Sequence, residues 1–363
     1  MFALVWRGLA VLLGACLLAL SAAGCGSGKG GLVHGAGGVA PRVAGAAAGA
    51  GAAGSAGGSA GGSAGGSAPR ARPVSLALVA AQSENRLVLV NLPRGRVIGS
   101  VPVAADPEYV AATRRDVVAV SASGSVTVLE RSSLRRVRVL GGFVSPHIPA
   151  ISADGAYAYV TDDARGTLTT IRLRDARITS RIVVGLGAHH MGVAPDGKAL
   201  WVALGQSAST IVLLDTSDPA HPRVTGTFAP GFRVHAVEFT PDGRRVWITS
   251  ANGSDVGVFS AAPPRLLFRV PGGVPPQHIA FAGASAYVTS GYGSTIERVS
   301  LATGRLIRRV SAPYGSFELD ARGGYVVASS LFRGTLSVYD ARLDLERTVR
   351  VAPATEDVVI PPS

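Results

Sequence analysis

Cysteine and lysine are scarce in this sequence. The two cysteines, Cys16 and Cys25, both precede the part of the chain that has strand-like patterning. No disulfide can therefore stabilise that part, whatever the compartment in which it folds. Among 35 basic residues only Lys29 and Lys198 are lysines, a bias that points to a G+C-rich genome rather than to a function.

Several catalytic and cofactor-binding signatures are also missing. Outside the Gly/Ala/Ser-rich segment the sequence has no GxSxG pattern that could form a nucleophile elbow, and it has no Walker loop, no CxxCH haem motif and no CxxC zinc motif. Its PDG and ADG turns each offer one acid, whereas calcium needs a dense cluster of oxygen ligands. These absences argue against the corresponding enzyme and metalloprotein classes.

The first 24 residues have the layout of a bacterial export signal. A single positive charge at Arg7 precedes an apolar run over 9–20, which is too short to span a bilayer comfortably as a permanent helix. The following SAAGC resembles a lipobox, although Ala22 stands where leucine is commonest. We expect a lipoprotein acylated at Cys25 on the extracytoplasmic face of the membrane; cleavage nearby and secretion is the alternative.

A tether follows over residues 25–73. It consists almost wholly of glycine, alanine and serine without hydrophobic periodicity, so it cannot bury enough apolar surface to fold. A coil of about 47 residues has a root-mean-square span of roughly 40 Å. We expect it to lift a folded domain clear of the membrane.

From residue 74 onward the sequence repeats with a period of about 41.5 residues. Copies include HIPAISADGAYAYVTD at 147–162, AHHMGVAPDGKALWVA at 188–203, HAVEFTPDGRRVWITS at 235–250 and the shorter HIAFAGASAYVTS at 278–290. Each has an apolar strand, a turn and a second strand with an aromatic residue near its start. This order of strands and turns predicts four-stranded propeller blades, with Trp201 and Trp247 in the core between them.

The two ends of the repeat region complement each other. Residues 75–103 supply three strands with no inner strand before them, and EDVVI at 356–360 matches an inner strand. The C-terminal strand is therefore expected to complete the first blade. With six full blades besides this shared one, the sequence predicts an all-β, seven-bladed β-propeller over residues 74–363.

The repeats resemble the YVTN-type β-propeller family, typified by YncE-like proteins and surface-layer-associated repeat proteins. PDG followed by WVA or WIT, ADG followed by YVTD, and AYVTS carry this resemblance over about residues 74–363. It implies a recognition scaffold, since few activities are defined for the family.

Arginines at strand edges explain most of the net charge of +12. Residues 1–72 hold five basic residues and no acid; after these are subtracted, the remainder carries +7. The fourth strand of a blade is its exposed edge, where positive charge discourages pairing with another chain. We therefore expect a monomer without a nucleic-acid partner. The arginines that open these strands are Arg96, Arg135, Arg177, Arg223, Arg265, Arg305 and Arg347.

Histidines recur at one repeat position in four consecutive blades. The position is the start of the inner strand, which lies at one mouth of the propeller channel. Imidazole is the commonest ligand of zinc and copper, so the arc could hold a metal ion, line the mouth as a polar rim for another ligand, or be purely structural. No other cofactor is indicated. These metal-ligand candidates are His147, His189, His235 and His278, with His190 beside them.

Acids flank the arc, and Arg233 lies two residues before His235. Glu108, His235 and Arg233 could polarise and hydrolyse an ester, as in lactonases of similar outline, but no lactonase motif aligns residue by residue. We favour a non-enzymatic cell-surface binding scaffold for an unidentified protein, polysaccharide or small molecule over a lactonase-like hydrolase or a metal-binding propeller. The expected binding mouth is Glu108, His147, His189, His190, His235, His278 and Asp357, with Glu356 as the alternative register to Asp357.

Overall fold

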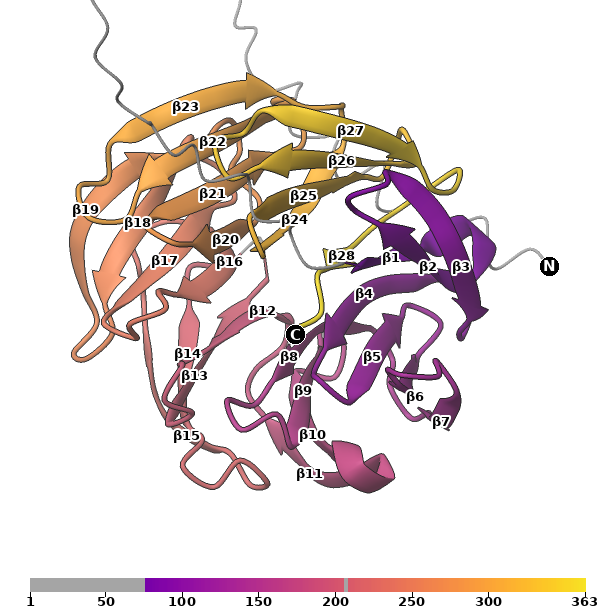
Figure 1. Cartoon of the computed structure of the whole chain (residues 1–363). Coiled ribbons are helices and arrows are strands. Elements are labelled where there is room, and N and C mark those ends of the chain that lie inside the picture. Colours follow the sequence, from indigo (N-terminus) through magenta and orange to yellow (C-terminus); the bar gives the residue numbers. More distant parts are fainter. Residues whose placement is uncertain (1–75, 206–207) are drawn as a thin grey trace, which may run out of the picture. The chain divides into compact units, whose positions relative to one another are not determined.

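The computed structural model describes residues 76–205 and 208–363. These residues form seven four-stranded antiparallel sheets in a ring (Figure 1). The predicted all-β, seven-bladed propeller is therefore confirmed. No helix in the described residues is long and apolar enough to cross a membrane. The predicted signal peptide, the acylated Cys25 and the tether lie outside the described residues and stay predictions.

Blades 1 to 3 come from the two ends of the domain and the segment that follows its start. Blade 1 contains β28 (Val358–Val359), β1 (Leu76–Ala81), β2 (Arg86–Asn91) and β3 (Arg96–Pro102). Blade 2 contains β4 (Pro107–Ala112), β5 (Asp116–Ser121), β6 (Ser125–Glu130) and β7 (Arg136–Leu140). Blade 3 contains β8 (Pro146–Ile151), β9 (Tyr157–Asp162), β10 (Thr167–Arg172) and β11 (Arg177–Val183).

Blades 4 to 7 follow in chain order, each with its inner strand first. Blade 4 contains β12 (Ala188–Val193), β13 (Ala199–Leu204), β14 (Ile211–Asp215) and β15 (Arg223–Phe228). Blade 5 contains β16 (Val234–Phe239), β17 (Arg245–Ser250), β18 (Asp255–Ser260) and β19 (Arg265–Pro271). Blade 6 contains β20 (Ile279–Ala282), β21 (Ser285–Ser290), β22 (Thr295–Ser300) and β23 (Leu306–Ser311). Blade 7 contains β24 (Ser316–Arg322), β25 (Tyr325–Ser330), β26 (Thr335–Asp340) and β27 (Leu345–Arg350).

The C-terminal strand closes the ring as predicted. β28 pairs with β1 in antiparallel register, with Val358 opposite Val79. Carboxylates fix its position: Asp357 accepts a 2.8 Å hydrogen bond from the Val110 amide of blade 2, and Asp320 of blade 7 accepts one of 2.7 Å from the Ile360 amide. The last strand is thereby tied to both neighbouring blades.

The hydrophobic core is divided among the blade interfaces. Seven clusters of buried apolar side chains each combine residues from two neighbouring blades. Trp201 and Trp247 lie in the interfaces between blades 4 and 5 and between blades 5 and 6, with 2% and 0% of their surface exposed. Their predicted place in the core is confirmed.

In blades 2 to 7 a tight turn joins the inner strand to its neighbour. Between β8 and β9, Asp154 accepts hydrogen bonds from the Ser152 hydroxyl (2.6 Å) and the Ala156 amide (3.0 Å). Gly155 there has φ +71°, a conformation that glycine adopts without steric cost. Residues 240–243 form the same turn between β16 and β17.

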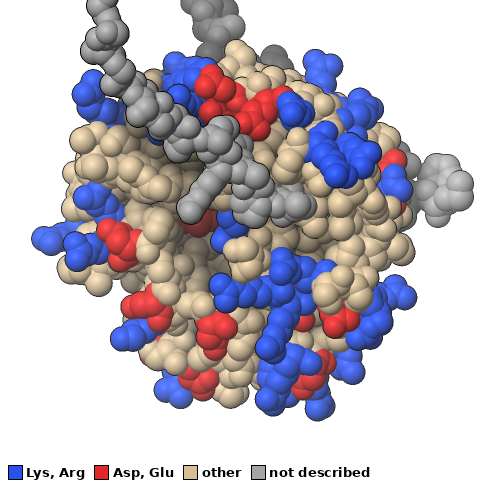
Figure 2. All heavy atoms as spheres, in the orientation of Figure 1, with Lys and Arg blue, Asp and Glu red and all other residues tan. Residues whose placement is uncertain are grey.

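The outer strands are exposed and basic. Every residue of β7 except Leu140 is exposed, and Lys and Arg are concentrated over blades 2 and 3 (Figure 2). β3, β11, β15 and β19 begin at the predicted arginines, whereas β7, β23 and β27 begin one or two residues away from them. Charged outer edges of this kind discourage edge-to-edge association.

Candidate functional site

The candidate site is built on β-bulges near the start of the inner strands. In β12 the register shifts between Ala188 and Met191, so His189 and His190 lie together opposite one residue of β13. β8, β16 and β24 carry the same irregularity. A bulge re-aims side chains, and here it lets one strand present two side chains to the centre of the ring.

Strand pairing assigns two bulge positions to each blade, counted back from the residue opposite the fourth residue of the second strand. The predicted repeat alignment is wrong by one residue in blades 6 and 7. Gln277 and not His278 is equivalent to His235 in blade 6, and Phe317 stands where Ser316 was predicted in blade 7. In blade 1 the alternative register, Glu356, is the equivalent residue. The first position holds Glu108, His147, His189, His235, Gln277, Phe317 and Glu356, and the second holds Tyr109, Ile148, His190, Ala236, His278, Glu318 and Asp357.

Five imidazoles from blades 3 to 6 meet at the centre. The rings of His147 and His189 stack with centroids 3.6 Å apart, and those of His235 and His278 meet edge to face at 5.2 Å. His190 lies among them, with its centroid 4.4 to 5.0 Å from each of the other four. The structure thus brings together all the histidines predicted for the channel mouth.

Three of these rings have an unpartnered nitrogen. Among the described residues, nothing hydrogen-bonds to the buried Nε2 atoms of His147, His190 and His235. Burial lowers the pKa of all three imidazoles well below its ordinary value, so the rings are neutral at pH 7. A neutral imidazole nitrogen is a metal ligand, whereas a buried polar atom without any partner is costly.

Carboxylates orient the other two imidazoles. Asp163 lies 2.7 Å from Nδ1 of His189 and leaves its Nε2 available, while Glu318 lies 2.7 Å from Nε2 of His278 and leaves its Nδ1 available. Metal-binding histidines commonly bond a carboxylate through their second nitrogen in this way. Neither acid was predicted, because Asp163 lies in a loop outside the repeat alignment and the register in blade 7 was displaced.

Acidic side chains from blades 7, 1 and 2 complete the ring. Burial raises the pKa of Glu318 and Glu356 well above its ordinary value and that of Glu108 to about 7. The centre therefore has an imidazole arc and a carboxyl arc, and burial favours the uncharged form on both. Asp357 has a structural part as well, since its carboxylate accepts the amides of Val110 and Val358.

The threonine of the YVT motif links neighbouring blades at the site. Thr161 donates a 2.6 Å hydrogen bond to the His189 carbonyl of the next blade, and Thr249 donates one of 2.9 Å to the Gln277 carbonyl. Thr289 and Ser329 make the same bond to the first bulge position of blades 7 and 1. These repeated hydroxyl groups thus hold in place the inner strands that carry the site residues.

The three residues predicted for ester hydrolysis are not assembled into one constellation. Among the described residues Glu108 receives a 3.4 Å hydrogen bond from Gln82 Nε2, and His235 packs against other imidazoles. Arg233 is exposed, and the structure shows no hydrogen bond or ion pair from its guanidinium to Glu108 or His235 within the described range. The catalytic assignment therefore stays a prediction without geometric support.

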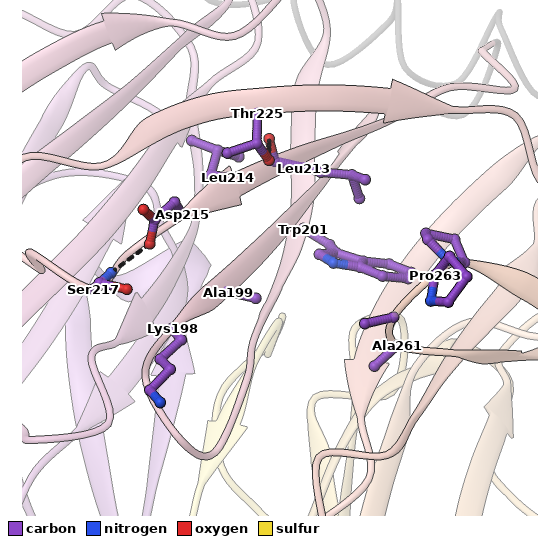
Figure 3. Close-up of a pocket in the computed structure, with 12 residues that line it drawn as sticks. Lys198, Ala199, Trp201, Leu213, Leu214, Asp215, Ser217, Thr225, Ala261 and Pro263 are labelled. Carbon is purple, nitrogen blue, oxygen red and sulfur yellow. Dashed lines mark hydrogen bonds between the residues drawn. The ribbon is translucent and has the colours of Figure 1, made fainter.

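A surface groove of about 360 Å³ lies at the opposite end of the blades (Figure 3). It is lined by Trp201, Leu213 and Pro263, with Lys198 and Asp215 at its side; Asp215 accepts the Ser217 amide at 2.9 Å. Its lining comes from turns and outer parts of blades 4 and 5. It is separate from the inner-strand bulges, and no predicted site residue lines it.

Fold and centre together define a class: a seven-bladed β-propeller with a buried polar cluster at one end of its inner strands. No protein-family model matches the chain, and no curated protein matches its sequence. Solved propeller structures do match it. A protein of unknown function from Desulfotomaculum acetoxidans aligns with TM-score 0.70 and 18% identity over 79% of this chain and 98% of its own.

Two further solved structures are named as enzymes. Hydrazine synthase from Kuenenia stuttgartiensis aligns with TM-score 0.66 and 18% identity, covering 74% of this chain and 92% of that chain. Dihydro-heme d1 dehydrogenase NirN aligns with TM-score 0.57 and 17% identity, covering 81% of this chain and 77% of that chain. At these identities the likeness shows the fold and nothing about the site.

Proposed function

We propose that this protein binds a divalent transition-metal ion through the imidazole cluster at the centre of its propeller. The observation that carries the proposal is the set of three neutral imidazoles whose buried Nε2 atoms have no partner among the described residues. Two more rings, those of His189 and His278, each contact a carboxylate through one nitrogen, which leaves the second nitrogen as a possible ligand. Buried nitrogens without a partner cost folding free energy, and a bound metal ion would supply that partner.

The donor spacing fits an ion after small movements. The histidine donor atoms form two groups of three, and within each group they lie within 4.8 Å of one another. Metal–nitrogen bonds of about 2.0–2.1 Å place two ligating nitrogens at most about 4.2 Å apart. Closing this difference requires side-chain shifts below about 1 Å, which rotation about χ1 and χ2 supplies.

The donor type selects copper and zinc. Imidazole nitrogens suit Cu²⁺, Zn²⁺ and Ni²⁺, whereas Mg²⁺ and Ca²⁺ prefer oxygen. With nitrogen donors the Irving–Williams order places Cu²⁺ above Zn²⁺ in affinity. The buried carboxyls opposite the histidines would ionise beside a cation and balance its charge.

The proposed setting is the outer face of a bacterial membrane. The lipobox-like SAAGC before Cys25 and the Gly/Ala-rich tether support an exported, lipid-anchored protein, and the in-register WVA, WIT and YVT repeats support membership of the YVTN-type family. We propose binding rather than hydrolysis, because Glu108, His235 and Arg233 are not assembled. Hydrazine synthase and NirN, two enzymes among the neighbours, share the architecture only.

Metal content tests the proposal directly. The full-length protein, untagged and purified without chelating resin, is incubated with Cu²⁺ or Zn²⁺, dialysed and analysed by elemental mass spectrometry. We expect at least one equivalent in the wild type and less than a tenth of that in a variant with His147, His190 and His235 changed to Ala. The matched control is His221→Ala, because His221 is exposed and its ring pairs with nearby Asp218. A wild type that is folded by circular dichroism yet retains no metal overturns the proposal.

A further inference from the structure

The imidazole cluster has a central member. His190 is the only one of the five rings in contact with all four others, through centroid distances of 5.0, 4.6, 4.4 and 4.7 Å. It is also nearly fully buried, at 3% exposed, and its Nε2 has no partner among the described residues. His190 is therefore in contact with the histidines on both sides of the cluster.

The donors divide into two sets around that ring. One set is His147, His189 and His190, and the other is His190, His235 and His278. Only His190 belongs to both. Since two nitrogens on one ion lie at most about 4.2 Å apart, and the five donors do not form one group even within 4.8 Å, a single ion cannot bind all five histidines in this arrangement.

The carboxylates leave one nitrogen donor on His189 and one on His278. Asp163 occupies Nδ1 of His189 and Glu318 occupies Nε2 of His278, both at 2.7 Å. The nitrogens that these carboxylates leave are Nε2 of His189, a residue of the first set, and Nδ1 of His278, a residue of the second. Each set is therefore supported by its own carboxylate, as expected if each holds an ion of its own.

We propose that the centre binds two divalent metal ions, one in each set, bridged by His190. This inference rests on the proposed metal-binding function. A bridging ring binds one ion through Nδ1 and the other through Nε2, so it loses its N–H proton, which passes to solvent. With metal–nitrogen bonds of about 2.0 Å, an imidazolate bridge holds the ions about 6 Å apart.

The surrounding acids make two dications tolerable. Two such ions bring four positive charges, and the imidazolate offsets one of them. Glu108, Glu318 and Glu356 face the centre from the blades opposite the histidines, with Asp357 beside them, and cations favour the ionised form of such groups. A site for one ion would need fewer acids than this ring contains.

Stoichiometry and spin coupling test the bridge. Metal-free full-length protein is titrated with Cu²⁺ and examined by native mass spectrometry and electron paramagnetic resonance. We expect two ions per chain and an exchange-coupled spectrum of reduced intensity. His147→Ala and His278→Ala should each bind one ion, with the full uncoupled signal of that ion. His190→Ala should abolish coupling, whatever metal it retains, and His221→Ala should match the wild type.

The outcomes separate the two proposals. One ion per chain in the wild type, with an uncoupled spectrum, overturns the bridge and leaves metal binding standing. No bound ion overturns both. Two ions with an uncoupled spectrum that His190→Ala does not change also overturns the bridge, since the ions would then occupy independent sites.

Discussion

Single residues at the centre of the ring owe their chemistry to burial. Burial lowers the pKa of His278 to about 4 and raises that of Glu108 to about 7, because the charged form of either group loses its hydration. At neutral pH His278 is thus uncharged and about half of Glu108 is protonated. A cation there would be met by neutral imidazoles, each of which has one nitrogen without a proton.

The same physics predicts how stability depends on pH. Glu238, on β16, has a pKa of about 8, raised from 4.5 by burial and by nearby Asp320 and Glu318. Between these values the folded protein holds a proton that the unfolded chain releases, so the free energy of unfolding falls as pH rises from about 4.5 to about 8 and then levels off. Glu238→Gln should remove this loss. At pH 9 the metal-free variant should exceed the wild type in stability by on the order of 5 kcal/mol, and near pH 4.5 the two should agree.

Urea unfolding of both proteins at the two pH values measures this difference. Glu130→Gln, a substitution on a half-exposed side chain, should leave the pH dependence unchanged. An equal difference between Glu238→Gln and the wild type at pH 4.5 and pH 9 would contradict the assignment of the raised pKa.

At the scale of strands, the bulge and the motif threonine form one device. Thr249 accepts a 2.8 Å hydrogen bond from the Ala236 amide inside the bulge and donates to the Gln277 carbonyl of the next blade. The bulge leaves a backbone amide without a ladder partner, and the hydroxyl supplies one. This gives a physical reason for the Thr of the YVT and WIT repeats, although Ala203 stands at this place in blade 4.

Removal of that hydroxyl should be costly. Thr249→Val keeps the side-chain volume but leaves a buried amide and a buried carbonyl unpaired, and we expect a loss of about 2 kcal/mol in the free energy of unfolding. Thr225→Val, on exposed β15, removes one hydroxyl bond to Leu213 of its own blade and should cost less than about 0.5 kcal/mol. Chemical denaturation of both variants would reveal equal losses if the link between blades had no special weight.

At the scale of the whole propeller, stability depends on closure. β28 pairs with β1, and Asp357 and Asp320 bind its ends to blades 2 and 7. The interface between blades 1 and 7 also contains Val358 and Ile360. Without them the first blade would expose a strand edge toward the centre and the ring would lose its junction.

A C-terminal deletion tests this dependence. Loss of residues 356–363 should lower the melting temperature by more than 10 °C or prevent folding, because backbone pairing and buried apolar surface are lost together. Deletion of 361–363 removes the hydrogen bonds that the carbonyls of Pro362 and Ser363 accept from Arg131 and Arg114 and should shift it by a few degrees at most. Thermal unfolding followed by circular dichroism compares the two, and similar melting temperatures would show that the ring closes without its last strand.

What the sequence determined by itself was the architecture. A period of about 41.5 residues, Asp-Gly turns and a spare inner strand after the last blade were enough to predict seven blades, their closure and the buried Trp201 and Trp247. Such features are local and repeat many times, so a wrong interpretation of one copy is corrected by comparison with the others. The repeated histidines were identified as a candidate site in the same way.

Only the tertiary structure decided how those histidines meet. The bulge shifts the register by one residue, which the repeat alone did not reveal. The inner strands of blades 6 and 7 were therefore misaligned, Glu318 was not predicted, and His190 was treated as a mere neighbour of His189. Distances between rings, the unpartnered Nε2 atoms and the carboxylates of Asp163 and Glu318 depend on blades brought together from distant parts of the chain. The chemistry at the centre depends on side chains from several blades that meet there, and no single repeat contains all of them.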